Sequence, residues 1–255
     1  MIPRLDPAFL GAPLAHRGLH DVRDGRPENS RAAIEAAIAH GYGIEIDLQL
    51  TADNFAVAFH DYALERLTEG SGPVRAQSAR DLAAVPLRGG SEGIPGLPEV
   101  LELVAGRVPL LIEIKDQDGS MGSQIGPLEA ATAAALAGYG GPVAVMSYNP
   151  HSVARMAELC PDIARGLVTE AYDPGNWPFS RTVCDHLREI PDFDRVGASF
   201  ISHDATDLTR PRVAELKAQG ANILCWTVRS PQAEAEARKI AQNVTFEGYL
   251  AAHPG

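Results

Sequence analysis

Residues 43–50 read GIEIDLQL and residues 108–115 read VPLLIEIK. In both stretches apolar and polar side chains alternate with the period of two that a β-strand imposes. The apolar face of each stretch carries Ile or Leu at every second position. The opposite faces carry Glu45, Asp47 and Gln49 in the first stretch and Leu111, Glu113 and Lys115 in the second. The two stretches therefore predict strands that combine an apolar face with a charged one.

Six further apolar runs resemble strands, and helix-like segments separate most of them. With the two stretches above, the predicted strands are residues 12–17, 43–50, 108–115, 143–148, 163–169, 196–203, 222–228 and 244–249. Eight strand–helix units in 255 residues give about 32 residues per unit, the size of a βαβ repeat. Eight alternating units favour an α/β fold, a closed (β/α)8 TIM barrel. No linker or change in composition divides the chain, so we expect one domain over residues 1–255.

The segment after the second predicted strand departs from this rhythm. Residues 55–61 form a further short strand pattern, and glycine-rich loops follow at residues 69–73 and 89–93. We predict a small insertion over about residues 55–97, between the second and third units. Insertions at the carboxyl end of a barrel usually shape the substrate pocket.

Composition limits the setting and the partners. The chain has 22 Lys and Arg against 33 Asp and Glu, so its formal net charge is 22 − 33 = −11. An acidic surface without a basic stripe argues against nucleic acid and against stable association with an anionic membrane. Three widely spaced cysteines and the lack of a signal-like start predict reduced, buried thiols in a cytoplasmic protein.

The charged strand faces predict a metal site. If the apolar faces pack on helices, then Glu45, Asp47 and Glu113 converge at the mouth of the barrel. The alternative is a pair of half-exposed antiparallel strands with polar faces in water. Each like-charge pair at about 4 Å costs about 4 kcal/mol at an effective dielectric constant near 20, so the cluster needs a cation. Oxygen ligands suit Mg²⁺ or Ca²⁺, with Mn²⁺ also compatible, and Lys115 and Arg17 would offset the remaining negative charge.

Two histidines are candidates for acid–base chemistry. His16 ends the first predicted strand and His60 ends the extra strand, so both belong near the carboxylates. With ordinary pKa values near 6.5, one imidazole can hold a proton while the other accepts one. His20 and His203 are weaker candidates.

Taken together, these residues resemble the glycerophosphodiester phosphodiesterase family. The resemblance covers nearly the whole chain and rests on an ordered series of motifs: His16-Arg17-Gly18, Pro27-Glu28-Asn29-Ser30, Glu45-Ile46-Asp47-Leu48, Phe59-His60-Asp61, Gly70-Ser71-Gly72, Leu97-Pro98-Glu99-Val100-Leu101, Glu113-Ile114-Lys115 and Cys225-Trp226-Thr227-Val228.

The resemblance implies roles for individual residues. It implies Glu45, Asp47 and Glu113 as metal ligands and His16 and His60 as the catalytic acid–base pair. It further implies Arg17 and Lys115 as phosphate-binding cations and Trp226 as an aromatic residue on the glycerol side of the pocket. Asn29 and Ser30 are interpreted as caps of the first helix, and the role of Glu28 is open.

The resemblance also implies an activity. In this family the glycerol 2-hydroxyl is thought to attack phosphorus, and water then opens the cyclic phosphate. The products expected here are sn-glycerol 3-phosphate and an alcohol such as choline or ethanolamine. Two departures bear on alcohol specificity: Arg229 stands where the family often has Asn, and Glu247 stands in the last strand's usual aspartate motif. We expect neither departure to touch the predicted ligands, histidines or cations.

Two other functions fit the same scaffold. A lysophospholipase D or phosphotransferase would need an apolar channel, and residues 62–97 offer scattered Leu and Val with a single aromatic residue, Tyr62. A non-catalytic barrel that binds phosphorylated metabolites would be expected to lack a ligand or a histidine, and none is missing. We therefore expect a water-soluble glycerophosphodiester as the substrate.

Overall fold

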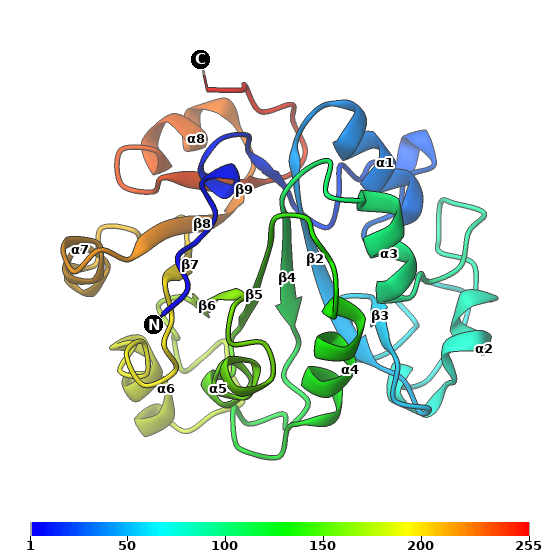
Figure 1. Cartoon of the computed structure of the whole chain (residues 1–255), viewed down its shortest axis with the longest axis horizontal. Helices are drawn as coiled ribbons and strands as arrows, with labels where there is room; N and C mark the ends of the chain where they lie inside the picture. The colour runs from blue at the N-terminus through cyan, green and yellow to red at the C-terminus, as the bar shows by residue number, and fades with distance from the viewer. Residues whose placement is uncertain (1, 255) are drawn as a thin grey trace.

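Eight parallel strands close into a barrel in the computed structural model, which describes residues 2–254 (Figure 1). β1 pairs in parallel with both β2 and β9, which closes the sheet. The predicted α/β barrel is therefore confirmed. The barrel strands are β1 (Leu14–Ala15), β2 (Gly43–Leu50), β4 (Leu110–Ile114), β5 (Val143–Ser147), β6 (Ala164–Thr169), β7 (Phe200–Asp204), β8 (Asn222–Val228) and β9 (Asn243–Phe246).

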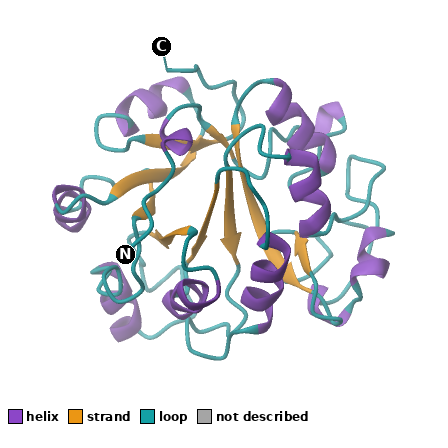
Figure 2. Ribbon diagram, viewed as in Figure 1, coloured by secondary structure: helices purple, strands orange, loops and turns teal. Residues whose placement is uncertain are grey.

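Helices surround the strands on the outside of the barrel (Figure 2). Several begin at a capping side chain: that of Asn149 accepts the His151 N–H, and that of Ser230 accepts the Ala233 N–H. The α-helices are α1 (Arg31–Ala39), α2 (Ala79–Ala83), α3 (Leu97–Val104), α4 (Pro127–Leu136), α5 (Pro150–Leu159), α6 (Arg181–Arg188), α7 (Pro211–Ala218) and α8 (Pro231–Ala237). Short 3₁₀ turns cover Pro7–Leu10 (η1), Val22–Asp24 (η2) and Val74–Ala76 (η3).

The two faces of the strands enter two separate apolar clusters. The predicted apolar face of β2 packs with the surrounding helices, and Ile44, Ile46 and Leu48 are fully buried there. The inner cluster fills the barrel and contains Leu111 of β4 together with Phe9 of η1, at the amino ends of the strands. Apolar side chains thus fill the barrel toward the amino ends of the strands. The charged side chains of β2 and β4 lie nearer its carboxyl end.

The segment between β2 and β4 has a small apolar cluster of its own. β3 (Ala56–Ala58) runs antiparallel to β2, and η3 and α2 follow it. The Phe59 N–H donates to the carbonyl oxygen of Asp47 (3.0 Å). His60 is the next residue, so this hydrogen bond holds its backbone close to β2. The cluster consists of Val57, Phe59, Leu64, Val74, Leu82, Leu87 and Ile94. This packing fixes the position of His60 relative to β2.

Several predicted strands are shorter in the structure. The prediction of residues 12–17 exceeds β1, because the backbone at Arg17 and Gly18 turns to positive φ (55° and 78°), which a strand does not allow. The prediction of 196–203 starts too early, because residues 191–197 form turns before β7. All three cysteines are free, and Cys184 and Cys225 are buried as expected, whereas Cys160 is half-buried.

Within residues 2–254, none of the helices combines the length and apolar character that crossing a bilayer requires.

Gly18 provides a test of how closely the first loop packs on α1. A Cβ atom at this position would lie 2.8 Å from the backbone carbonyl carbon of Ala33, whereas one at Gly72 would meet nothing within 4 Å. Both glycines have positive φ (78° and 89°). We expect Gly72→Ala to lower the free energy of unfolding by about 1–2 kcal/mol from backbone strain alone. Gly18→Ala should cost a further ~1–3 kcal/mol from the clash. Urea denaturation measures both, and equal losses would contradict this close packing.

Candidate active site

The carboxylates of Glu45, Asp47 and Glu113 meet at the carboxyl end of β2 and β4. Asp47 and Glu113 are paired residues of the two neighbouring strands, and Glu45 lies two positions before Asp47 on the same face. One oxygen from each of the three lies within 4.8 Å of the others. All three residues are nearly inaccessible, with exposed fractions of 2%, 1% and 7%. The sequence prediction that these residues converge is correct in the structure.

Burial and mutual repulsion disfavour charge at this cluster. Burial, followed by the charges of Asp47 and Glu113, raises the pKa of Glu45 well above its ordinary value. Burial likewise raises the pKa of Glu113. Buried carboxylates in this state fit a divalent cation, and three carboxylate donors suit Mg²⁺, Ca²⁺ or Mn²⁺.

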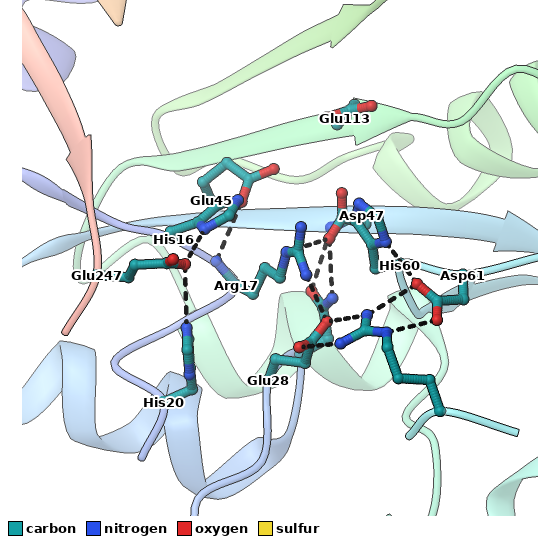
Figure 3. Close-up of polar contacts among 12 residues, drawn as sticks. His16, Arg17, His20, Glu28, Glu45, Asp47, His60, Asp61, Glu113 and Glu247 are labelled. Carbon is teal, nitrogen blue, oxygen red and sulfur yellow. Dashed lines mark hydrogen bonds and ion pairs between the residues drawn. The ribbon is translucent and has the colours of Figure 1, made fainter. Parts of the chain in front are cut away.

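Lys115 and Arg17 lie against the same carboxylates (Figure 3 shows Arg17). The Nζ atom of Lys115 is 2.7 Å from Asp47 Oδ1 and 2.8 Å from Glu113 Oε1. The Nε atom of Arg17 is 3.3 Å from Asp47 Oδ2. Burial opposes ionisation of Asp47, yet Lys115, His60 and Arg17 together hold its pKa well below its usual range. Each cation is thus held beside the acidic cluster, where it can also face a bound anion.

Asn29 supports the cluster, which corrects its interpretation as a helix cap. Its side-chain amide donates to Asp47 Oδ2 (3.0 Å), and its amide oxygen accepts the Asp47 N–H (3.1 Å). Only Ser30 caps α1, accepting the Ala33 N–H. The side chain of Glu28 binds Arg17 (2.6 Å) and so holds this cation in place.

His16 is backed by a carboxylate that the sequence did not reveal. Its Nδ1 atom is 2.5 Å from Oε2 of Glu247, directly after β9, and its Nε2 atom faces Glu45 Oε2 at 4.0 Å (Figure 3). The other oxygen of Glu247 accepts a hydrogen bond from Arg229 (2.7 Å). Burial lowers the pKa of His16, and the hydrogen bond from His16 keeps Glu247 ionised by lowering its pKa. The two departures from the family pattern therefore contact each other, and one of them, Glu247, contacts a predicted catalytic residue, contrary to the expectation that neither touches the predicted site residues.

His60 has an equivalent arrangement on the other flank of the cluster. Its Nδ1 atom is 2.7 Å from Asp61 Oδ1, and Arg66 binds both oxygens of Asp61 (2.6 and 2.8 Å). Arg66 also binds Glu28, which links this flank to Arg17. Burial lowers the pKa of His60, although the charge of Asp47 opposes the shift. Both histidines therefore have Nδ1 tied to a carboxylate, and burial lowers the pKa of each.

The weaker histidine candidates differ in their surroundings. The Nε2 atom of His20 lies 3.5 Å from Glu247 Oε2, so His20 borders the site. His203 is fully buried, with Nδ1 on Thr169 (2.8 Å) and Nε2 on Asp207 (3.2 Å), and both of its ring nitrogens serve the fold.

A cavity of about 640 Å³ opens beside these residues. It is lined by His60, Glu113 and Lys115 together with the aromatic side chains of Tyr148 and Trp177. Trp226, predicted on the glycerol side, is half-buried in β8 with its ring 5.9 Å from that of Tyr148. Its indole N–H donates to the carbonyl oxygen of Ser202 (3.0 Å), so its outer edge is fixed.

Comparison with known proteins identifies the family. The profile of the "Glycerophosphoryl diester phosphodiesterase family" matches residues 16–246. The chain belongs to this family. It is 30% identical over 234 residues to YhdW of Bacillus subtilis, a provisionally named glycerophosphodiester phosphodiesterase, with 88% of each chain covered. It is 32% identical over 165 residues to a glycerophosphodiester phosphodiesterase of Caldanaerobacter subterraneus, covering 61% of this chain and 65% of that enzyme.

Solved structures of the family share the barrel. A phosphodiesterase of Oleispira antarctica, in complex with sn-glycerol-3-phosphate, superposes with a TM-score of 0.77 at 23% identity, covering 94% of each chain. A glycerophosphodiester phosphodiesterase of Thermotoga maritima gives 0.69 at 19% identity, covering 92% of this chain and 94% of that one. The predictions of the family, of the barrel and of an enzyme of the phosphoric diester hydrolase class are thereby confirmed. The roles of individual site residues stay predictions.

Lys115 offers a test of the buried charge balance. Replacing it by methionine leaves Asp47 and Glu113 without their shared cation, and breaking a buried pair in this way costs about 3–5 kcal/mol. The freed carboxylates would have raised pKa values in the folded state, so the loss should be largest near pH 8 and shrink as the pH falls to 5.

Urea unfolding in a chelating buffer at both pH values measures the change. The exposed pair Lys239–Glu236 supplies the control, since Lys239→Met should alter stability by less than about 1 kcal/mol. A pH-independent loss in Lys115→Met would contradict the charge balance described here.

Proposed function

We propose that this phosphodiesterase hydrolyses water-soluble glycerophosphodiesters, such as glycerophosphocholine and glycerophosphoethanolamine, to sn-glycerol 3-phosphate and an alcohol. One observation carries the proposal: two imidazoles, each tied to a carboxylate through Nδ1, flank a buried cluster of three carboxylates that also holds Lys115 and Arg17. This set supplies an acid, a base and positive charge within one site.

A divalent cation completes the proposed site. Glu45, Asp47 and Glu113 would hold it, and the raised pKa values of Glu45 and Glu113 fit a site whose charge requires a cation. When bound, the cation would polarise the phosphoryl oxygens and favour ionisation of a substrate hydroxyl. Mg²⁺ or Ca²⁺ suits three carboxylate donors.

Arg17 and Lys115 would bind the non-bridging phosphoryl oxygens. Both are charged at every physiological pH, because the neighbouring carboxylates raise their pKa values despite burial. Glu28 fixes the Arg17 guanidinium, and Asp47 and Glu113 fix the Lys115 ammonium, so little reorganisation is needed as negative charge builds on the phosphoryl group.

The histidines would move the protons. One imidazole takes the proton of the glycerol 2-hydroxyl as its oxygen forms a bond to phosphorus. The other, which enters the step as the imidazolium with a proton on Nε2, protonates the departing alcohol oxygen as the bond from that oxygen to phosphorus breaks and is left neutral. Water then opens the cyclic phosphate with the two histidines in exchanged roles, which returns each to its starting state. Because Glu247 and Asp61 occupy the Nδ1 atoms, the exchange takes place at Nε2 of each ring.

The comparisons support a small-molecule substrate. The Oleispira antarctica relative holds sn-glycerol-3-phosphate, which is the product proposed here. A cytoplasmic location, and a choice between a soluble diester and a lysophospholipid, stay predictions.

The direct test is release of glycerol 3-phosphate from glycerophosphocholine with Mg²⁺, Ca²⁺ or a chelator. We expect activity that the chelator abolishes, and His16→Ala and His60→Ala should each lower kcat by about 10²–10⁴. His186→Ala, on the exposed surface of α6, should match the parent enzyme and serves as the control. Undiminished turnover in chelator would remove the metal from the proposal, and faster turnover of lysophosphatidylcholine would favour a lysophospholipase D.

Glu247 gives a second test, directed at the orientation of His16. A glutamine can present its amide N–H to Nδ1, which favours the tautomer that carries its proton on Nε2. We expect Glu247→Gln to lower kcat with little change in KM, by up to about 10⁴-fold, the loss found when the carboxylate behind a catalytic histidine becomes an amide.

The matching spectroscopic readout is ¹⁵N NMR of the histidine side chains. It should show Nε2 of His16 unprotonated in the parent enzyme and protonated in Glu247→Gln. Arg229→Gln leaves the Glu247 carboxylate in place and should retain most of the activity. Parent-like kcat in Glu247→Gln would show that this contact does not orient His16.

A further inference from the structure

An aromatic wall faces the proposed reaction site across the cavity. Tyr148 follows β5, Glu170 follows β6, and Trp177 lies in the loop between β6 and α6, so all three stand at the carboxyl ends of the strands. The rings of Tyr148 and Trp177 are 5.3 Å apart and inclined at 58°. Both line the cavity that also contains Glu113 and Lys115.

A carboxylate stands behind this wall. The indole N–H of Trp177 donates to Glu170 Oε1 (2.5 Å), and the hydroxyl of Tyr148 donates to Glu170 Oε2 (3.4 Å). Both oxygens of Glu170 are therefore engaged by the aromatic residues. Negative charge at the indole N–H makes the ring face more attractive to a cation.

Glu170 has no counter-ion in the part of the chain that the structure describes. Among residues 2–254, no Lys, Arg or His nitrogen lies within 4 Å of its carboxylate, and the same holds for Asp204 at the end of β7. By contrast, Glu28, Asp61 and Glu247 at the same mouth are each bound to an arginine. Burial, with the charge of Asp204 as a further cause, raises the pKa of Glu170. Within residues 2–254, the two carboxylates on this side of the mouth therefore have no directly bound cation, whereas those on the phosphate side do.

We propose that Tyr148, Trp177 and Glu170 form a head-group subsite that selects a quaternary ammonium alcohol over neutral alcohols. The inference rests on the proposed function, because it places the leaving alcohol of the diester against this wall. A quaternary ammonium carries no N–H, so it needs a polarisable face and a nearby negative charge rather than hydrogen-bond acceptors. The rings of Tyr148 and Trp177 offer the polarisable face. Glu170 offers the negative charge, because its oxygens already accept hydrogen bonds from these two residues.

The chemistry of the wall separates this ligand from two others. A primary ammonium would present three N–H donors, for which Glu170 has little free acceptor capacity. An acyl chain would place hydrocarbon beside an unpaired carboxylate, which loses hydration without compensation.

The test compares two diesters of the same shape. One is glycerophosphocholine, and the other is its 3,3-dimethylbutyl isostere, in which a carbon replaces the charged nitrogen. We expect the parent enzyme to favour the choline diester in kcat/KM by about tenfold, the scale of a desolvated cation–π contact. Trp177→Leu and Glu170→Gln should bring the ratio close to one, and Trp177→Phe, which keeps an aromatic face, should retain most of it.

The ratio distinguishes selection from structural support. If the parent enzyme does not prefer the charged diester, or if the variants slow both diesters equally, the proposal is overturned. If neither diester is hydrolysed with any metal, the proposed function fails, and a measurement of choline binding then tests the subsite by itself. The chain has two tryptophans, so Trp226→Phe isolates the fluorescence of Trp177. Saturable quenching by choline but not by 3,3-dimethylbutanol would support the subsite, and its absence would overturn it.

Discussion

The negative charge concentrated on β2 and β4 determines which side chains must lie beside it at the mouth of the barrel. Asp47 and Glu113 are paired residues of neighbouring strands, and Glu45 shares their face, so the backbone itself forces three carboxylates together in a buried position. Burial and repulsion would neutralise them or drive them apart unless cations stand beside them. Lys115 and Arg17 meet part of this need. The negative charge that these two residues leave unbalanced gives the site its capacity for a divalent ion.

Around this centre the chain repeats one arrangement on both flanks. His16 rests on Glu247, which Arg229 binds, and His60 rests on Asp61, which Arg66 binds. One flank arises where the last strand closes beside the first, and the other is brought in by the segment after β2. On each flank, the carboxylate orients the imidazole through a hydrogen bond at Nδ1, and an arginine balances the negative charge of that carboxylate. On the opposite wall, no Lys, Arg or His among residues 2–254 forms an ion pair with Glu170, so the two sides of the mouth differ in how their carboxylates are balanced.

The sequence was most informative where structure depends on local pattern. Alternation within residues 43–50 and 108–115 predicted both strands and the convergence of Glu45, Asp47 and Glu113, because register between neighbouring strands leaves few choices. Contacts between distant segments could not be predicted in this way. Glu247 reaches His16 across 231 positions, and only closure of the barrel brings them together. Asn29 was misassigned for a related reason: its position before a helix indicates a cap, whereas its side chain turns to Asp47. β1 is short because the backbone of Arg17 has a positive φ, and nothing in the sequence pattern predicts this conformation at an arginine.

We propose that the three carboxylates of β2 and β4 form one binding site for a divalent cation. Isothermal titration of metal-free protein with Mn²⁺ or Ca²⁺ tests it directly, with Asp47→Asn as the altered site and Asp185→Asn on the exposed face of α6 as the control. Binding of one ion per chain to the parent protein and to the control, and its loss in Asp47→Asn, is the predicted result. Unchanged binding in Asp47→Asn, or no binding by the parent protein, would contradict it.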